Sequence, residues 1–176
     1  MSKVRSGLTY GIALTAAIAL AGCGNDSDDS DDIAAATPAE KCVALTGAQV
    51  PSTDIGLPTR GASVSNTTLR PATSTLREYC RVEGEIHSVD TTAEPIKFVV
   101  ALPTEWNNRM MQLGGGGWNG TIPNVESAAS AFTSGPVPLA RGYAAYASDS
   151  GHSVKSGVNA AAFTLNEEQL RNFASE

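Results

Sequence analysis

Hydrophobic and polar positions alternate along two segments in the middle of the chain, with the period of a half-buried β-strand. The first segment covers residues 80–86 and the second covers residues 96–103. The apolar and small positions of the first predicted strand are Cys80, Val82, Gly84 and Ile86. In the second, Ile96, Phe98, Val100 and Leu102 share one face. The opposite face of the first strand is charged, and we predict that His87, which continues this polar series, is solvated.

Turns and caps delimit the remaining elements. Residues 106–108 (Trp-Asn-Asn) predict a tight turn, because asparagine tolerates the left-handed region, and residues 109–113 then predict a third strand. Residues 142–151 are small and aromatic, as in a strand buried on both faces.

A short helix is predicted at residues 128–132. A second helix is predicted after a cap at Asn166, with Leu170 and Phe173 on one face. Residues 42–70 are rich in Thr, Ser, Gly and Pro and predict a mostly irregular segment.

The N-terminus has the pattern of a secretory signal. Lys3 and Arg5 precede the apolar residues 11–22, which are too few to span a bilayer as a helix. Residues 20–23 (Leu-Ala-Gly-Cys) resemble a bacterial lipobox, so we expect cleavage after residue 22 and lipidation of Cys23. Gly24 stands where an aspartate usually retains lipoproteins in the inner membrane. The sequence thus predicts an exported bacterial lipoprotein that is either membrane-anchored, in the outer membrane, or periplasmic or extracellular. The alternative is ordinary signal cleavage beside a stray cysteine.

Five aspartates between residues 26 and 32 contribute most of the net charge of -6. They repel one another and offer nothing to bury, so residues 23–41 are interpreted as a disordered tether before a domain at residues 42–176. A site for a metal ion or a basic partner is the alternative for this acidic run. The chain carries no basic stripe, and we expect no nucleic-acid partner.

Two cysteines remain once Cys23 is assigned to lipid. Cys42 and Cys80 form an even pair in a chain exported to an oxidising compartment, which favours a disulfide over two free thiols. No Cys-x-x-Cys motif is present and no histidine lies near either cysteine in sequence, so a zinc site has little support.

The segment QLGGGGWNGT, residues 112–121, places four glycines after the third predicted strand. It satisfies Gly-x-Gly-x-x-Gly, but a dinucleotide-binding loop opens a helix, whereas Pro123 follows here, and no acidic residue lies twenty positions on. A phosphate-binding loop would need Gly-Lys-Ser/Thr, which is absent. A third use is an oxyanion hole, in which glycine backbone N–H groups converge on a carbonyl oxygen that a side chain would block.

Three segments, YCRVEGEI (residues 79–86), IKFVVALPTEWNNRMMQLGGGGWNGTI (residues 96–122) and RGYAAYASDSGH (residues 141–152), together resemble the tannase/feruloyl esterase family. The resemblance implies the N-terminal, β-rich part of an α/β-hydrolase fold, with a lid domain inserted later. It assigns backbone N–H groups of the oxyanion hole to Gly117, with Gly116 beside it. It also pairs Cys42 with Cys80. The family usually has glycine where this chain has Asn108, the mildest substitute in a turn.

The family's catalytic triad uses a serine in a Cys-Ser-x-Gly-Gly elbow, and these 176 residues contain neither that motif nor Gly-x-Ser-x-Gly. Asp149, His152 and Ser153 suggest a local triad, but neighbours on one loop rarely place a nucleophile, base and orienting acid correctly. We instead expect Asp149 and His152 to brace the loop beside the oxyanion hole by hydrogen bonds.

The sequence therefore predicts part of a carboxylic ester hydrolase that acts on small aromatic-acid esters through an acyl-serine, here without its nucleophile, acid and histidine. No metal or other cofactor is expected, because any calcium site of the family's lid lies outside this chain. The alternative from another class is a non-catalytic lipoprotein of the cell envelope that serves as a binding module.

Overall fold

The computed structural model describes residues 36–128, 134–154 and 159–175. The predicted signal, the lipidation site at Cys23 and most of the predicted helix at 128–132 lie outside these residues. Among the described residues, no helix is long and apolar enough to cross a membrane. Along the chain the elements are α1 (Pro38–Val43), β1 (Gln49–Val50), η1 (Ser52–Asp54), β2 (Ala62–Arg70), β3 (Tyr79–Ile86), β4 (Ile96–Pro103), β5 (Met110–Gln112), η2 (Leu139–Arg141), β6 (Ala144–Ser148), η3 (Ala162–Leu165) and α2 (Glu167–Ser175).

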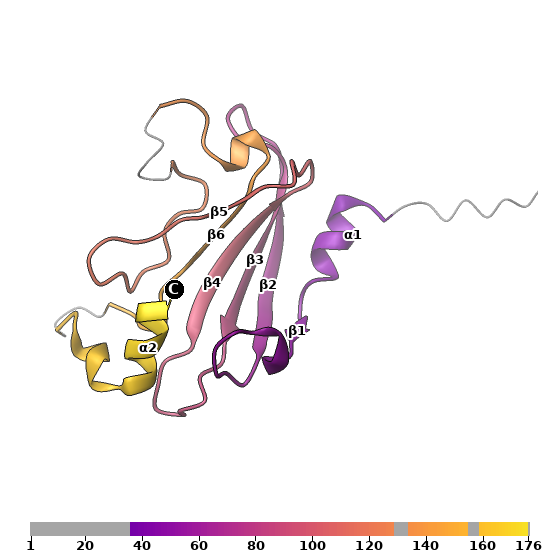
Figure 1. The fold of residues 1–176 in the computed structure, drawn as a ribbon. Helices are drawn as coiled ribbons and strands as arrows, with labels where there is room; N and C mark the ends of the chain where they lie inside the picture. The colour runs from indigo at the N-terminus through magenta and orange to yellow at the C-terminus, as the bar shows by residue number, and fades with distance from the viewer. Residues whose placement is uncertain (1–35, 129–133, 155–158, 176) are drawn as a thin grey trace, which may run out of the picture. The chain divides into compact units, whose positions relative to one another are not determined.

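The strands form one mixed sheet in the order β1-β2-β3-β4-β6-β5 (Figure 1). All described pairs are antiparallel except β5 with β6, which is parallel. The predicted α/β class, with a β-rich front end and strands leading into a glycine loop, is confirmed. The strands predicted at 80–86 and 96–103 are β3 and β4, and the doubly buried strand within 142–151 is β6.

One face of the sheet carries the main core. Tyr79, Val99, Ala101, Ala145 and Ala147 are buried on this face. The connection between β5 and β6 covers it, and inserts the buried side chains of Leu113, Val125 and Leu139. The alternation of side chains along each strand places β4's Phe98 and Val100 on the other face.

Helix α1 packs on that other face, beside β2 and β3 (Figure 1). Thr37 and Glu40 form a reciprocal capping box at its N-terminus, and Cys42 is disulfide-bonded to Cys80 across 38 residues of sequence. Cys42, Cys80 and Val82 form a small buried cluster there. The predicted disulfide is present. Residues 38–41, assigned from sequence to the tether, instead belong to this helix.

Strand β2 corrects the prediction that residues 42–70 are mostly irregular. It pairs with β3 along its length, with a bulge between Val64 and Asn66 that breaks the alternation. Its side chains are mostly polar and only partly buried, so the hydrophobic pattern is weak. The strand exists because β3 supplies hydrogen-bond partners for its backbone, and a sequence window does not reveal such a partner.

Helix α2 begins where predicted, since Asn166 Oδ1 accepts a hydrogen bond of 3.0 Å from the backbone N–H of Gln169. Its buried residues are Gln169 and Asn172, while Leu170 is 41% exposed. The buried side of α2 is therefore not the face that carries Leu170. The Gln169 side chain reaches the carbonyl of Gly151 at 3.3 Å, so this helix packs against the polar loop after β6.

Candidate functional site

The parallel strands β5 and β6 place two loops at the same edge of the sheet. The glycine loop, residues 114–120, follows β5, and a second loop, residues 149–154, follows β6. Leu113 is buried and donates its backbone N–H to the carbonyl of Tyr146 at 2.8 Å, which holds the start of the glycine loop against β6. The outer side of the carboxyl ends of parallel strands is where ligands bind in open α/β sheets.

Asn119 joins the two loops. Its amide nitrogen donates to the carbonyl of Ser148 at 3.3 Å and to the hydroxyl of Ser150. The two loops also meet through their backbones, where Val154 donates to Gly120. Asn119 and Ser150 have positive φ angles of 54° and 59°. These contacts hold both loops in one arrangement.

Gly116 and Gly117 lie at the exposed tip of the glycine loop. Within the described residues, no hydrogen-bond acceptor is found for either backbone N–H. A Cβ placed on either glycine would meet nothing within 4 Å, and Gly117 has a φ of 61°. A ligand oxygen can therefore approach these donors, and glycine is favoured at 117 because the left-handed conformation penalises most side chains.

Gly115 has a different role from the two glycines that follow it. A Cβ at Gly115 would lie 1.8 Å from the side-chain oxygen of Asn119. The run of glycines thus serves two needs: Asn119 packs close to the backbone at 115, and the backbone stays open at 116 and 117.

Asp149 is 3% exposed and holds the second loop to the sheet. Its Oδ1 accepts hydrogen bonds from the backbone N–H groups of Lys97 at 2.9 Å and Gly151 at 3.1 Å. A buried carboxylate that accepts backbone N–H bonds fixes the conformation of the loop that carries it. This is the hydrogen-bonded bracing that the sequence led us to expect of Asp149.

His152 does not act as predicted. It is 3% exposed, and neither ring nitrogen has a hydrogen-bond partner within the described part of the chain. Its ring stacks on Phe163, with centroids 3.8 Å apart, and meets Phe173 edge-on at 5.8 Å. The imidazole therefore braces the loop by packing, and because neither nitrogen is bonded to Asp149 or Ser153, these three residues form no relay.

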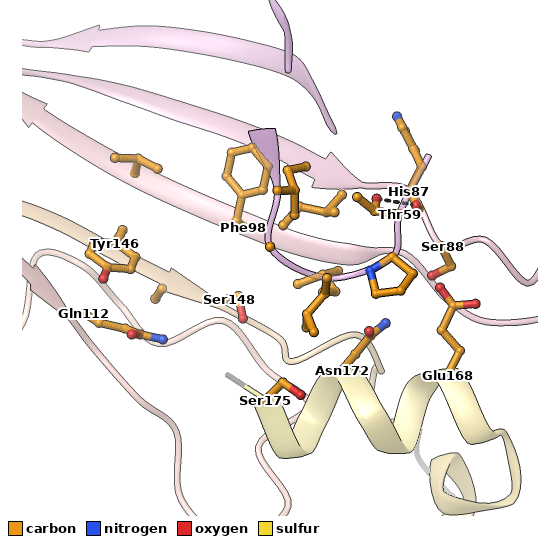
Figure 2. A pocket seen from close by; sticks show the side chains of 18 residues that line it. Thr59, His87, Ser88, Phe98, Gln112, Tyr146, Ser148, Glu168, Asn172 and Ser175 are labelled. Atoms are coloured by element: carbon orange, nitrogen blue, oxygen red, sulfur yellow. Dashed lines mark hydrogen bonds between the residues drawn. The ribbon is translucent and has the colours of Figure 1, made fainter. Parts of the chain in front are cut away.

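A cavity of about 430 Å³ lies elsewhere, on the sheet face opposite the main core (Figure 2). Ile86, Ile96, Phe98 and Val100 line it together with segment 55–59 and helix α2, whereas no residue of the glycine loop does. We interpret this cavity as a part of the sheet face that no other element covers, because its lining is mostly apolar. The side chains of Glu168 and His87, which also line it, are already hydrogen-bonded within the protein.

These two polar side chains of the cavity lining have different hydrogen-bond partners. Glu168 accepts the backbone N–H groups of Val89 at 2.7 Å and Asp90 at 2.5 Å. His87 is half-buried, and its Nε2 lies 2.9 Å from the hydroxyl of Ser63. The prediction that His87 is solvated is therefore wrong; pairing of β2 with β3 brings Ser63 beside it. No three His, Cys, Asp or Glu side chains of the described residues are placed to hold a metal ion.

Comparison with known proteins finds esterases of one family. The sequence pattern of the family described as "Tannase and feruloyl esterase" matches residues 80–176. An uncharacterized esterase of Agrobacterium fabrum is 38% identical over 136 residues, which are 75% of this chain and 24% of that protein. The mono(2-hydroxyethyl) terephthalate hydrolase of Piscinibacter sakaiensis is 36% identical over 90 residues, covering 47% of this chain and 14% of that protein.

Among solved structures, feruloyl esterase B of Aspergillus oryzae matches with a TM-score of 0.49 at 21% identity, over 72% of this chain and 25% of that one. The chain thus spans about a quarter or less of the length of each of these relatives.

Proposed function

Because the chain belongs to the tannase and feruloyl esterase family, we propose that it supplies the oxyanion hole of a serine-dependent carboxylic ester hydrolase acting on esters of aromatic acids. The observation that carries the proposal is the pair of unoccupied backbone donors at Gly116 and Gly117, on a loop fixed by Asn119. Preorganised donors of this kind stabilise the negative charge that develops on a carbonyl oxygen during acyl transfer.

The chemistry divides between this chain and a segment that carries the nucleophile. A serine oxygen adds to the ester carbonyl, whose oxygen becomes an oxyanion and is stabilised by the N–H of Gly117. The alcohol then leaves with a proton, an acyl-serine forms, and water releases the acid. The 176 residues contain no Cys-Ser-x-Gly-Gly or Gly-x-Ser-x-Gly motif, so the serine must come from that other segment.

The free edge of β5 is the place where such a segment would join the sheet. β5 ends the strand order, and its outer edge has no partner strand in the described part of the chain. Met110 on this strand is 65% exposed. An unpaired edge with exposed apolar side chains favours the addition of another strand. A strand added there in parallel would end beside Gly116 and Gly117.

The test compares the chain alone with the chain joined to a downstream segment bearing the elbow, acid and histidine. With a chromogenic aromatic ester, we expect no acyl-enzyme burst from the chain alone and steady turnover from the joined protein. Gly117→Val should lower kcat far more than KM, because the hole acts on the transition state. A drop on the order of 100-fold is expected, because valine disfavours the left-handed backbone at φ 61° that aims this N–H at the oxyanion.

Gly47→Val is the matched control, since Gly47 is also left-handed, with a φ of 79°, a Cβ there also meets nothing within 4 Å, and it lies outside the glycine loop. Serine-inhibitor-sensitive turnover by the 176 residues alone would contradict the proposal and direct attention to Ser153. A joined protein that binds aromatic esters without turnover would support the binding-module alternative.

We also propose that the protein is a lipoprotein anchored at Cys23, on the basis of Leu20, Ala21 and Gly22 before it. Several acyl chains give stable anchoring where one does not. In detergent phase partitioning the protein should enter the detergent layer, and Cys23→Ala should return it to water. If both forms stay in the aqueous layer, the lipobox interpretation is wrong.

A further inference from the structure

Trp118 directly follows the two glycines with open N–H groups, and its ring packs against two phenylalanine rings. Its ring lies 6.0 Å from the ring of Phe163 and 6.0 Å from that of Phe173, at interplanar angles of 67° and 52°. Phe163 is 6% exposed, so the support beneath the indole is part of the packed interior. Trp118 itself remains 50% exposed.

This aromatic cluster gives the exposed indole a fixed position. Phe163 and Phe173 are 5.1 Å apart and His152 stacks on Phe163, so four rings contact one another in a continuous group. Edge-to-face contacts at such separations favour one ring orientation. A large side chain that is already ordered loses little conformational entropy when a ligand packs on it.

Trp106 shows that exposure alone does not distinguish Trp118. Trp106 is 51% exposed, but its indole N–H is used, because it donates to the carbonyl of Arg109 at 2.8 Å. No such acceptor is found for the Trp118 indole N–H among the described residues. Trp118 therefore combines a supported ring, a free donor and a position next to the open amides, whereas Trp106 closes a turn.

We propose that the exposed surface of Trp118 is the contact for the aromatic ring of the ester, an inference that rests on the proposed function. Adjacent Cα atoms are about 3.8 Å apart. An ester carbonyl bound at Gly117 therefore has its substituents within reach of the neighbouring indole. An aromatic acyl group can pack on that indole, whereas a short aliphatic acyl group cannot cover it. Trp118 is thereby assigned as a specificity-determining residue.

The test uses the full chain with a single tryptophan. Trp106→Phe leaves Trp118 as the only reporter, and Trp118→Phe leaves Trp106, which is equally exposed. The probes are methyl benzoate and methyl cyclohexanecarboxylate. Both are methyl esters with a six-membered carbon ring, but only the ring of the benzoate is aromatic. The measurement is the protection of tryptophan fluorescence from acrylamide quenching as the ester is added. It requires no turnover and works at low micromolar protein.

In Trp106→Phe, methyl benzoate should protect the tryptophan saturably, and methyl cyclohexanecarboxylate should need roughly three- to ten-fold higher concentration, as expected for one aromatic contact. In Trp118→Phe, the remaining tryptophan should show no protection. Equal protection in both variants, or equal affinity for both probes, would overturn the inference. Circular dichroism checks that both variants keep the sheet, and an absent signal in a folded Trp106→Phe variant would also count against the inference.

A joined protein carrying the nucleophile separates this inference from the function on which it rests. There, Trp118→Ala should raise KM for the benzoate ester several-fold while changing kcat little, and should raise KM for the cyclohexane ester less, so that the preference for the aromatic ester shrinks. Normal turnover with unchanged selectivity would reject Trp118 and keep the esterase. Ring binding at Trp118 without any turnover would reject the esterase and keep the contact.

Discussion

At the scale of single residues, Asn119 is the side chain that joins the two loops of the candidate site. Its side chain bonds to Ser148 and Ser150 while its backbone adopts a φ of 54°. Asparagine is one of the few residues that visits this region readily, and its amide supplies the donor that a glycine would lack. Asn119 thus adds a side-chain tie between the glycine loop and β6 to the backbone hydrogen bonds at Leu113 and Gly120.

Replacing Asn119 should separate these two contributions. Asn119→Gly keeps the backbone conformation and loses the hydrogen bonds, whereas Asn119→Ala loses both. We expect Asn119→Ala to destabilise the fold by about 2 kcal/mol, of which roughly 1 kcal/mol is backbone strain that Asn119→Gly avoids. Urea unfolding of the three proteins measures this. Equal stability of the two variants would show that the left-handed backbone adds no cost.

Tyr79 gives the protein a dependence on alkaline pH. Its hydroxyl donates to Glu126, and burial, followed by that hydrogen bond and charge, raises the pKa of Tyr79 to about 12. Because the folded pKa lies above the unfolded value of about 10, this stabilisation is complete below pH 10 and is lost as the pH rises to 12.

Stability curves between pH 8 and 12 test this contribution. The Tyr79 contribution to the free energy of unfolding should be constant up to about pH 10 and should fall from there to about pH 12 in the native protein. In Tyr79→Phe, which keeps the ring in the core but has no proton to lose, the fall should be smaller. The variant should also lose about 1 kcal/mol at neutral pH, the net value of one hydrogen bond. Identical alkaline profiles would contradict the assignment.

At the scale of elements, helix α2 is attached to the sheet mainly by polar contacts. Asn166 caps the helix and also donates to the carboxylate of Asp90 at 2.9 Å, while Glu168 accepts backbone N–H groups of the same turn. The buried side of the helix carries Gln169 and Asn172 rather than Leu170. An amphipathic pattern does not reveal such an attachment, because the partners lie far away in the sequence.

The cap and the tie to Asp90 can be distinguished by substitution at Asn166. Asn166→Ala should cost roughly 1–2 kcal/mol, since it removes both. Asn166→Ser keeps an oxygen for the N–H of Gln169 and should recover most of the capping part. Helix signal by circular dichroism and urea midpoints provide the readout. If serine is as costly as alanine, the tie to Asp90 rather than the cap stabilises α2.

At the scale of the whole described domain, the sheet is covered unequally. The main core fills one face, whereas Ile96, Phe98 and Val100 on the other face remain only partly buried and line the cavity of about 430 Å³. β5 adds an unpaired edge. Exposed apolar patches and free strand edges promote association.

We therefore expect the chain expressed alone to be poorly soluble and to enhance the fluorescence of the dye ANS under native conditions. Leu57→Asn, at the rim of the cavity, should weaken the dye signal, and Val89→Asn, at a position outside the cavity, should leave it unchanged. These side chains are 37% and 53% exposed, so neither change opens the core. A soluble chain without dye binding would show that this face is effectively closed.

The sequence by itself determined the features that rest on local pattern and chemistry. Alternation located β3 and β4, the residue types around Asn166 located the start of α2, and asparagine at position 108 located a left-handed turn residue, with a φ of 63°. The glycine run and its neighbouring motifs indicated the family. Each of these depends on neighbours within a few positions, which the sequence places together directly.

The tertiary structure decided what depends on distant partners. Strand β2 needed the backbone of β3, the hydrogen bond of His87 needed Ser63, and the packing of His152 needed Phe163. A polar ring or a weakly patterned strand has several possible environments of similar free energy, and only the assembled neighbours select one. For the same reason the sequence marked Gly116 and Gly117 as possible donors, but only the structure shows both N–H groups left open beside the ordered ring of Trp118.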